Sequence, residues 1–366
     1  MIPRRFSYFP ALDGVRGVAL LMVLACHSLD PFFPAQGGSL GVNMFFVLSG
    51  FLITGLLLSE LDSTGSVWLG GFYLRRALRL MPPFILTLAL VAALPNVLPG
   101  SLGLSAILPA AFFYVGNYVQ AFSGHGSLGY LAHTWSLSVE EQFYLVWPIA
   151  LTWLAATGRL RRWLPGLILA FAASRAVLGL TGMPDVAAWL PSNADQLLIG
   201  ALLAVVFLQQ GAGWAASQRI GWAAVAALAA ITLIGSATRE GTQGPLAIYG
   251  GLTIAGLASA ALIAHLVTAT RGPLVWLFTL TPVIWLGRVS YGVYLFHYPI
   301  FKWTQAHDWP SSFKTVAVEY ALTAVPVLLS WFLVERSALR LKDRIHGRRA
   351  SAPRLIQVAT PETATT

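Results

Sequence analysis

Charged side chains are scarce in this chain, and their scarcity sets its class. Only 10% of the 366 residues are Asp, Glu, Lys or Arg, whereas 57% are hydrophobic. Soluble domains carry about a quarter charged residues, so this composition excludes a soluble globular protein and indicates an integral membrane protein. Apolar blocks recur along nearly the whole length, which leaves no room for a separate soluble domain.

Other absences narrow the class further. The single cysteine, Cys26, excludes an internal disulfide. The first apolar block lacks a small-residue cleavage site, so we interpret it as a transmembrane helix rather than a cleaved signal. No internal repeat is apparent, which disfavours a transporter built from two related halves. Acidic residues are few (14, against 23 Lys and Arg). The resulting charge of +9 is explained by cytoplasmic loops, without a nucleic-acid partner.

Eleven apolar blocks approach the ~20 residues that a transmembrane helix needs. They lie at residues 15–30, 41–58, 82–98, 104–120, 139–156, 163–181, 195–210, 219–236, 246–268, 285–303 and 315–334. Basic residues flank them at 4–5, 75–79, 159–162, 219 and 271, and in the segment 335–349.

All of these basic clusters fall on one side if the block 104–120 enters the membrane and returns. That block carries Asn117, Gln120 and a proline, and non-spanning backbone is tolerated at membrane depth where protein buries it. The sequence therefore predicts an all-α polytopic membrane protein with about ten transmembrane helices, one re-entrant segment and both termini cytoplasmic. The predicted membrane domain covers residues 1–345, and 346–366 is expected to form a polar, disordered tail.

The first block, "LDGVRGVALLMVLACHSLD", carries polar groups whose burial in hydrocarbon is costly and marks function. Arg16 and His27 are eleven residues apart, so a helix places them on one face about 16 Å apart along its axis. Arg16 lies near the cytoplasmic mouth and His27 in the outer half, and Asp13 is spaced to pair with Arg16. The alternative for Arg16 is that its charge only anchors the cytoplasmic end of the helix. The alternative for His27 is that it makes a hydrogen bond between packed helices.

The segment "FYLRRALRLMPPF" places Arg75, Arg76 and Arg79 just before Pro82 and Pro83, which we expect to open the third helix. Three guanidinium groups at the cytoplasmic mouth suit a phosphate-rich ligand, because their fork geometry matches phosphate oxygens. Plain positive-inside charge is the alternative for each of them.

The segment "HTWSLSVEEQFYLVWP" places Glu140, Glu141 and Tyr144 at the outer start of an otherwise apolar span. Glu140 and Tyr144 share a face, and helix capping by Ser138 explains one acidic residue but not two. We interpret the group as part of a site. In "GVNMFFVLSGFLI", Ser49 and its neighbouring glycine allow close approach of a helix or a substrate.

The segment "GRVSYGVYLFHYP" aligns Ser290, Tyr294 and His297 on one helix face, with His297 at the expected depth of His27. Arg175 in the sixth predicted span is a further candidate for substrate binding. The alternative is that Arg175 and Asp195 neutralise each other.

In order along the chain, several segments resemble the acyltransferase-3 family of integral membrane O-acyltransferases. The resemblance extends from about residue 10 to 337. It is carried by "LDGVRGVALLMVLACH", "GVNMFFVLSGFLI", "FYLRRALRLMPPF", "HTWSLSVEEQFYLVWP", "SNADQLLIGALLA", "LGRVSYGVYLFHYPI" and "SWFLVERS".

The resemblance implies transfer of an acyl group, commonly acetyl, from cytoplasmic acyl-CoA to a hydroxyl of a carbohydrate or similar acceptor. It matches Arg16 and His27 to the family's essential pair, Arg75, Arg76 and Arg79 to its arginine motif, and Glu140 to its acidic position. Asn43 stands where many members have aspartate, and Ser337 replaces a closing proline. Some members carry a fused extracytoplasmic esterase-like domain that completes the transfer. This chain ends in a short polar tail instead, so it is expected to finish the transfer itself or to pass the group to a separate protein.

Residue chemistry and resemblance together give a hypothesis. The arginines hold the phosphates of acyl-CoA, a co-substrate, with no tightly bound cofactor and no metal. His27 is a general base or a transient acyl carrier, oriented by Glu140, while Tyr144 and His297 stabilise the oxyanion or position the acceptor. Glycans, glycolipids and small molecules are possible acceptors, and the cell (inner) membrane is the expected location. A proton-coupled transporter of an anionic solute is the alternative function.

Overall fold

The computed structural model describes residues 6, 8–28, 35–94, 98, 101–124, 126–183, 185–210, 213–238, 244–310 and 312–336. Every regular element within these ranges is helical, which confirms the predicted all-α class. The helices of sixteen or more residues are α1 (Pro10–Ser28), α2 (Ala35–Thr64), α3 (Leu69–Ala93), α6 (Trp135–Ala156), α7 (Leu160–Leu180), α8 (Ala194–Gln209), α9 (Gln218–Thr238), α10 (Leu252–Thr268), α13 (Ser290–Ala306) and α14 (Phe313–Ser330). The shorter elements are α4 (Leu104–Phe112), α5 (Gly116–Ser123), η1 (Gly129–Thr134), η2 (Val186–Ala188), η4 (Ala247–Gly251), α11 (Pro273–Phe278), α12 (Thr281–Arg288) and η5 (Trp331–Glu335).

Seven helical stretches in the described chain are long and apolar enough to cross a membrane, so the protein is a multi-pass membrane protein. They are α1, α2, α3, α7, α9, η4 with α10, and α14 with η5. The other three predicted spans correspond to α6, α8 and α13, of which α8 is a shorter apolar helix. The count of ten spans stays a prediction that includes these three.

The block 104–120 does not form one helix. It folds into α4 and α5, separated at Tyr114, whose φ is 53°. Helices of nine and eight residues extend only about 14 and 12 Å, well short of the ~30 Å hydrocarbon core. The block therefore does not form one membrane-spanning helix, and its re-entrant path stays a prediction.

Helix α3 differs from the prediction that Pro82 and Pro83 open it. The helix begins at Leu69 and runs through both prolines, so the three arginines lie on the helix itself. Prolines are tolerated inside buried helices because neighbouring groups satisfy the backbone near them. The carbonyls that Pro82 and Pro83 leave without a helical donor are those of Leu78 and Arg79. Close to them, Thr87 Oγ1 donates to the Pro83 carbonyl (3.0 Å), and Tyr291 of α13 donates to the Leu80 carbonyl (3.0 Å).

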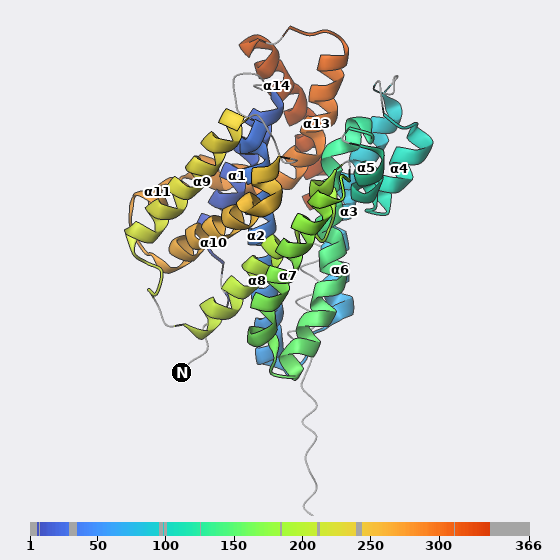
Figure 1. The fold of residues 1–366 in the computed structure, drawn as a ribbon. Coiled ribbons are helices and arrows are strands. Elements are labelled where there is room, and N and C mark those ends of the chain that lie inside the picture. Colours follow the sequence, from blue (N-terminus) through green and yellow to red (C-terminus); the bar gives the residue numbers. More distant parts are fainter. Residues whose placement is uncertain are drawn as a thin grey trace, which may run out of the picture.

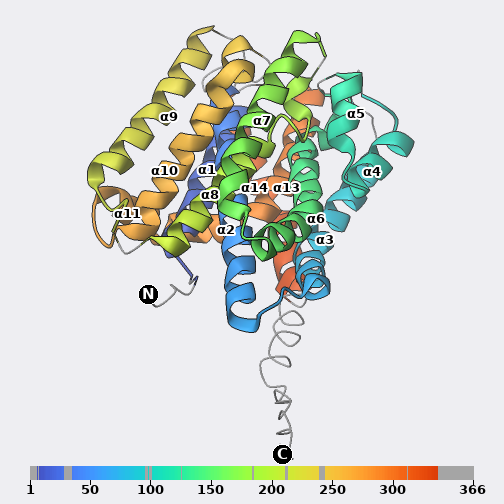
Figure 2. The same ribbon diagram turned by 60° about the horizontal axis from the view of Figure 1, so that its bottom comes forward.

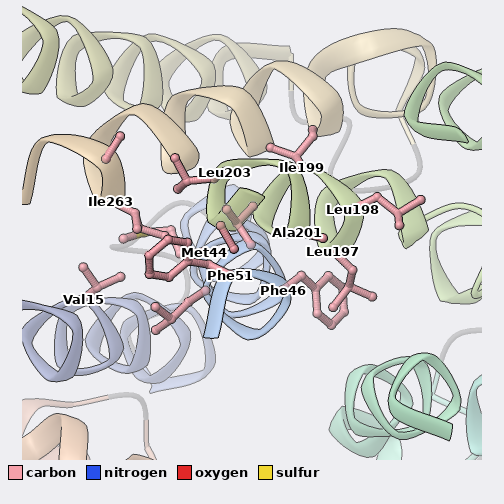
Figure 3. Close-up of a cluster of buried hydrophobic side chains, with 14 of the residues drawn as sticks. Val15, Met44, Phe46, Phe51, Leu197, Leu198, Ile199, Ala201, Leu203 and Ile263 are labelled. Carbon is pink, nitrogen blue, oxygen red and sulfur yellow. The ribbon is translucent and has the colours of Figure 1, made fainter. Parts of the chain in front are cut away.

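Helix α2 lies near the centre of the molecule. In Figure 2, α9 forms one edge and α4 with α5 the other, and α1, α2 and α8 lie between them. Figure 3 shows side chains of α1, α2, α8 and α10 converging on one apolar cluster, including Phe46 and Phe51. A Cβ atom on Gly50 would lie 1.9 Å from the Leu197 carbonyl oxygen, and one on Gly200 would lie 2.0 Å from that of Val47. These two glycines therefore let α2 and α8 approach closely, as expected for small residues in membrane helices.

The start of α1 and the end of η5 lie at the same end of the bundle, which agrees with termini on one side (Figure 2). The α13–α14 connection lies at the opposite end (Figure 1). The predicted tail, 346–366, falls outside the described residues.

Candidate functional site

Two histidines from distant parts of the sequence meet in the structure. His27, in the last turn of α1, and His297, in the middle of α13, are joined by a hydrogen bond of 3.0 Å between His27 Nδ1 and His297 Nε2. The contact between α1 and α13 brings them together, and His297 is fully buried. The structure thus unites two of the predicted site residues.

A third histidine, His133, completes this cluster. It lies on η1, and its ring stacks on Tyr298 (centroids 4.8 Å apart, 26° between planes) and meets His297 edge-on at 5.5 Å. His133 is buried, and neither of its ring nitrogens has a hydrogen-bond partner among the described residues. The sequence places His133 beside Glu140 and Glu141 but gives it no role of its own. Its signal was its place in the motif "HTWSL".

His27 and His133 line a cavity of about 530 Å³, and His297 lies behind His27, outside the lining. Its wall includes His27, His133 and two tyrosines of α13, Tyr294 and Tyr298. The other polar lining residues include Gln120, Asp185, Lys302, Gln305 and Glu319. The cavity also includes the α13–α14 connection, through Trp309, Pro310, Ser312 and Thr315. It therefore lies towards the end of the bundle that the predicted topology places outside.

Tyr294 is tied to the same region through its hydroxyl. That hydroxyl is 2.6 Å from Ser136 Oγ and donates to the His133 carbonyl at 2.8 Å. Tyr294 therefore holds η1 and the first turn of α6 against α13, and fixes the backbone that carries His133.

A charged cluster surrounds Asp13 at the start of α1. Arg16 Nη1 lies 2.6 Å from Asp13 Oδ1, which matches the predicted pairing. Tyr8 Oη donates to Asp13 Oδ2 (2.7 Å), and Arg288 of α12 donates to Tyr8 Oη (2.9 Å). Arg288 Nε also lies 3.6 Å from Asp13 Oδ2. One carboxylate thus faces two guanidinium groups, so the cluster carries net positive charge.

Helices α3 and α6 are joined by a second ion pair. Arg76 Nε lies 3.0 Å from both carboxylate oxygens of Glu141, and Arg76 Nη2 lies 2.6 Å from Oε1. The Arg76 guanidinium also lies over the ring of Tyr144, 3.2 Å from its centroid. Such a bidentate pair fixes orientation as well as charge. Arg76, Glu141 and Tyr144 therefore form one structural unit.

The partner of Glu140 differs from the one hypothesised. Ser49 of α2 donates to Glu140 Oε1 at 2.7 Å, whereas the imidazole of His27 is bonded to His297. His27 is thus bonded to His297 here, and an orienting role of Glu140 stays a hypothesis. Ser49 and Glu140, both predicted for the site, lie together.

The three arginines of α3 have different surroundings. Arg75 lies 3.6 Å from Glu60 and over the ring of Trp68, at 5.8 Å. Arg79 has no ion-pair or hydrogen-bond partner within the described chain, and its side chain is exposed. It interacts electrostatically with Arg16 and Arg76. Because like charges repel and Arg79 has no paired carboxylate, it is the arginine of α3 best placed to receive an anion.

Arg175 lies in a closed ion pair. Its Nη1 lies 2.9 Å from Asp195 Oδ1, and both side chains are almost completely buried. The remaining donors reach the carbonyls of Ser192 and Ile248 and the hydroxyl of Thr253, which itself donates to Asp195. This geometry favours the alternative that Arg175 and Asp195 neutralise each other.

Fold and clusters define a polytopic helical membrane protein with a histidine-lined cavity at one end and arginine–carboxylate clusters elsewhere. A family model described as "Acyltransferase domain" matches residues 9–335. The chain belongs to this acyltransferase family, as its motifs indicated.

Among curated proteins, the chain is similar to peptidoglycan O-acetyltransferase OatA of Listeria monocytogenes. The two are 32% identical over 319 residues, which are 81% of this chain and 50% of that protein. The chain is also similar to a Bacillus subtilis protein named "Putative peptidoglycan O-acetyltransferase YrhL", at 29% identity over 95% of this chain and 57% of that protein. This chain therefore spans about half the length of these relatives. No solved structure matches it.

Proposed function

We propose that the chain transfers an acetyl group from cytoplasmic acetyl-CoA to a hydroxyl of a cell-envelope glycan at the cell (inner) membrane. The observation that carries the proposal is the separation of two polar zones: cationic groups on α1 and α3, and an imidazole-lined cavity towards the other end of the bundle. The names of the relatives, both peptidoglycan O-acetyltransferases, support a glycan acceptor.

The donor binds through its phosphates. Arg79 supplies a guanidinium group with no partner in the described chain, and Arg16 supplies a second one near it. A phosphate oxygen accepts strong charge-assisted hydrogen bonds from both. The pantetheine arm then extends along the bundle and delivers the thioester to His27.

The acceptor occupies the cavity. Its wall is rich in donors and acceptors, which suits a sugar, and Tyr298 offers an aromatic face. His133 offers two ring nitrogens without protein partners, and a buried polar group gains most from a ligand that satisfies it. His133 therefore binds a hydroxyl of the acceptor.

The reaction needs one proton acceptor. The imidazole of His27 removes the proton from the acceptor hydroxyl, and the oxygen attacks the thioester carbonyl carbon. The C–S bond breaks, CoA leaves as the thiolate, and the imidazolium returns the proton to it. If His27 instead carries the acetyl group, the same carbonyl is attacked twice, first by the imidazole and then by the hydroxyl.

The test uses the purified chain in liposomes, with [14C]acetyl-CoA as donor and soluble muropeptides as acceptor. The proposal expects base-labile label on the muropeptides and one released CoA thiol for each acetyl group transferred. Purified protein that binds acetyl-CoA but never moves label to a glycan would contradict it. A proton-coupled transporter would instead need no CoA and would respond to a pH gradient across the liposomes.

A further inference from the structure

We propose that His297 is a positioning residue that holds His27 in the tautomer whose reactive lone pair is on Nε2. This inference rests on the proposed function only in naming His27 as the reactive group. Its basis is the hydrogen-bond pattern around the two rings.

The proton on His297 is assigned by its neighbours. Its Nδ1 lies 2.7 Å from the Tyr294 carbonyl oxygen and 3.1 Å from that of Val293. Carbonyl oxygens only accept hydrogen bonds, so Nδ1 must carry the proton. No carboxylate contacts the buried ring among the described residues, and a buried cation without a counter-charge is costly. His297 is therefore neutral, and its Nε2 is an acceptor.

The proton on His27 follows from that assignment. His27 Nδ1 lies 3.0 Å from His297 Nε2, and an acceptor there requires that Nδ1 donate. The ring centroids are 5.2 Å apart and the ring planes differ by only 20°. The rings thus meet edge to edge in nearly one plane, as a hydrogen bond between ring nitrogens requires. A neutral imidazole that donates from Nδ1 carries its lone pair on Nε2.

The pair of His27 and His297 resembles the histidine and the orienting carboxylate of a catalytic triad. In such triads a group bonded to Nδ1–H fixes the tautomer and orientation of the basic histidine. Here a neutral imidazole takes the place of the carboxylate, and two backbone carbonyls of α13 fix that imidazole in turn. A neutral partner adds no buried charge beside His27, but it stabilises an imidazolium on His27 less than a carboxylate would.

Two substitutions at His297 separate orientation from packing. The amide of Gln reaches the position of Nε2, so His297→Gln keeps an acceptor for His27 but loses the Nδ1 donor. The shorter Asn reaches only the position of Nδ1, so His297→Asn keeps the carbonyl contacts but loses that acceptor. A matched control is His265→Asn, at a buried histidine of α10 whose Nδ1 lies 3.2 Å from the Ala215 carbonyl oxygen.

The direct readout is the nitrogen NMR spectrum of purified chain labelled with 15N-histidine, with His27 assigned by its absence in His27→Ala. The wild-type protein and His297→Gln are expected to show His27 protonated on Nδ1, and His297→Asn to lose that pattern. A wild-type His27 protonated on Nε2, or a pattern unchanged in His297→Asn, would overturn the inference.

Kinetics provide the second readout. Misplacing a catalytic group by about 1 Å can lower rates by about 100-fold. We expect that fall in kcat for His297→Asn, with the KM for acetyl-CoA unchanged, while His297→Gln stays nearer to wild type and His265→Asn keeps wild-type kcat. Equal losses in Gln and Asn variants would contradict positioning by the acceptor. If the wild type shows the expected tautomer but transfers no acetyl, the proposed function fails and the tautomer assignment stands.

Discussion

The histidine cavity and the arginine–carboxylate clusters handle buried polarity in opposite ways. Around α1, α3 and α6, charges are mostly neutralised in place: Asp13 by Arg16, and Glu141 by Arg76. Around the cavity, the interacting imidazoles of His27 and His297 are held by a neutral hydrogen bond, and His133 has nitrogens without partners in the described chain.

This difference determines which kind of ligand each zone can bind. The Arg76–Glu141 pair is already satisfied, so an anion gains little by approaching it, whereas Arg79 and the net positive cluster of Asp13, Arg16 and Arg288 attract one. An imidazole with an unsatisfied nitrogen favours a hydroxyl, which can both donate and accept. The charged zone thus suits a phosphate-bearing donor, and the cavity suits a sugar.

Removing the reactive imidazole has the largest expected effect. General acid–base catalysis contributes about 10²- to 10⁴-fold, so His27→Ala should lower the rate of acetyl transfer by that factor. The rate is measured with labelled acetyl-CoA, and melting temperature checks the fold. His265→Ala, at the buried histidine of α10, is the control and should keep the wild-type rate. A folded His27→Ala protein with wild-type transfer would place the chemistry elsewhere.

The second largest effect is expected from breaking the buried ion pair between Arg175 and Asp195. It should lower the stability of the fold rather than substrate binding. Arg175→Met leaves Asp195 buried without its counter-charge, which costs about 3–5 kcal/mol in the free energy of unfolding. Arg175→Met combined with Asp195→Leu should recover part of that loss, because no charge stays unpaired. Thermal unfolding measures both. A folded double variant with a large rise in the KM for acetyl-CoA would show instead that Arg175 binds substrate.

The sequence predicted the fold class and the pairing of Arg16 with Asp13, because both depend on local patterns. Apolar blocks of membrane length predict helices from composition alone. Arg16 and Asp13 were paired correctly because three residues in a helix fix their distance.

Contacts between distant helices could not be read in that way. Glu140 and His297 have the same expected depth, and spacing within one helix cannot tell which of them reaches His27. The packing of α1 against α13 decides it. The start of α3 was missed because Pro82 and Pro83 act as helix breakers in isolation, whereas membrane helices tolerate proline where the surroundings satisfy the freed backbone groups.

The three arginines of α3 allow paired and unpaired cations to be compared on one helix. Arg75 and Arg76 are paired with Glu60 and Glu141, whereas Arg79 lacks a partner in the described chain. A charge-assisted hydrogen bond contributes about 1.5–3 kcal/mol, so Arg79→Gln should raise the KM for acetyl-CoA about 10- to 100-fold. Arg75→Gln should raise it less, because Glu60 already pairs with that side chain. Added salt should narrow the difference by screening exposed charges. Equal effects of the two substitutions would refute a special place for Arg79.

The smallest expected effect is that of replacing His133. The replacement should weaken binding of the acceptor and at the same time stabilise the fold. His133→Phe keeps an aromatic ring against Tyr298 but removes both nitrogens, which have no partner among the described residues. Losing a hydrogen bond of about 0.5–1.5 kcal/mol should raise the KM for muropeptide about 3- to 10-fold and leave the KM for acetyl-CoA unchanged. Removing an unsatisfied buried polar group should at the same time raise the free energy of unfolding by about 1 kcal/mol. Kinetics and thermal unfolding of the same preparation measure both. A less stable variant with an unchanged KM for muropeptide would make His133 a packing residue and move the acceptor to another part of the cavity.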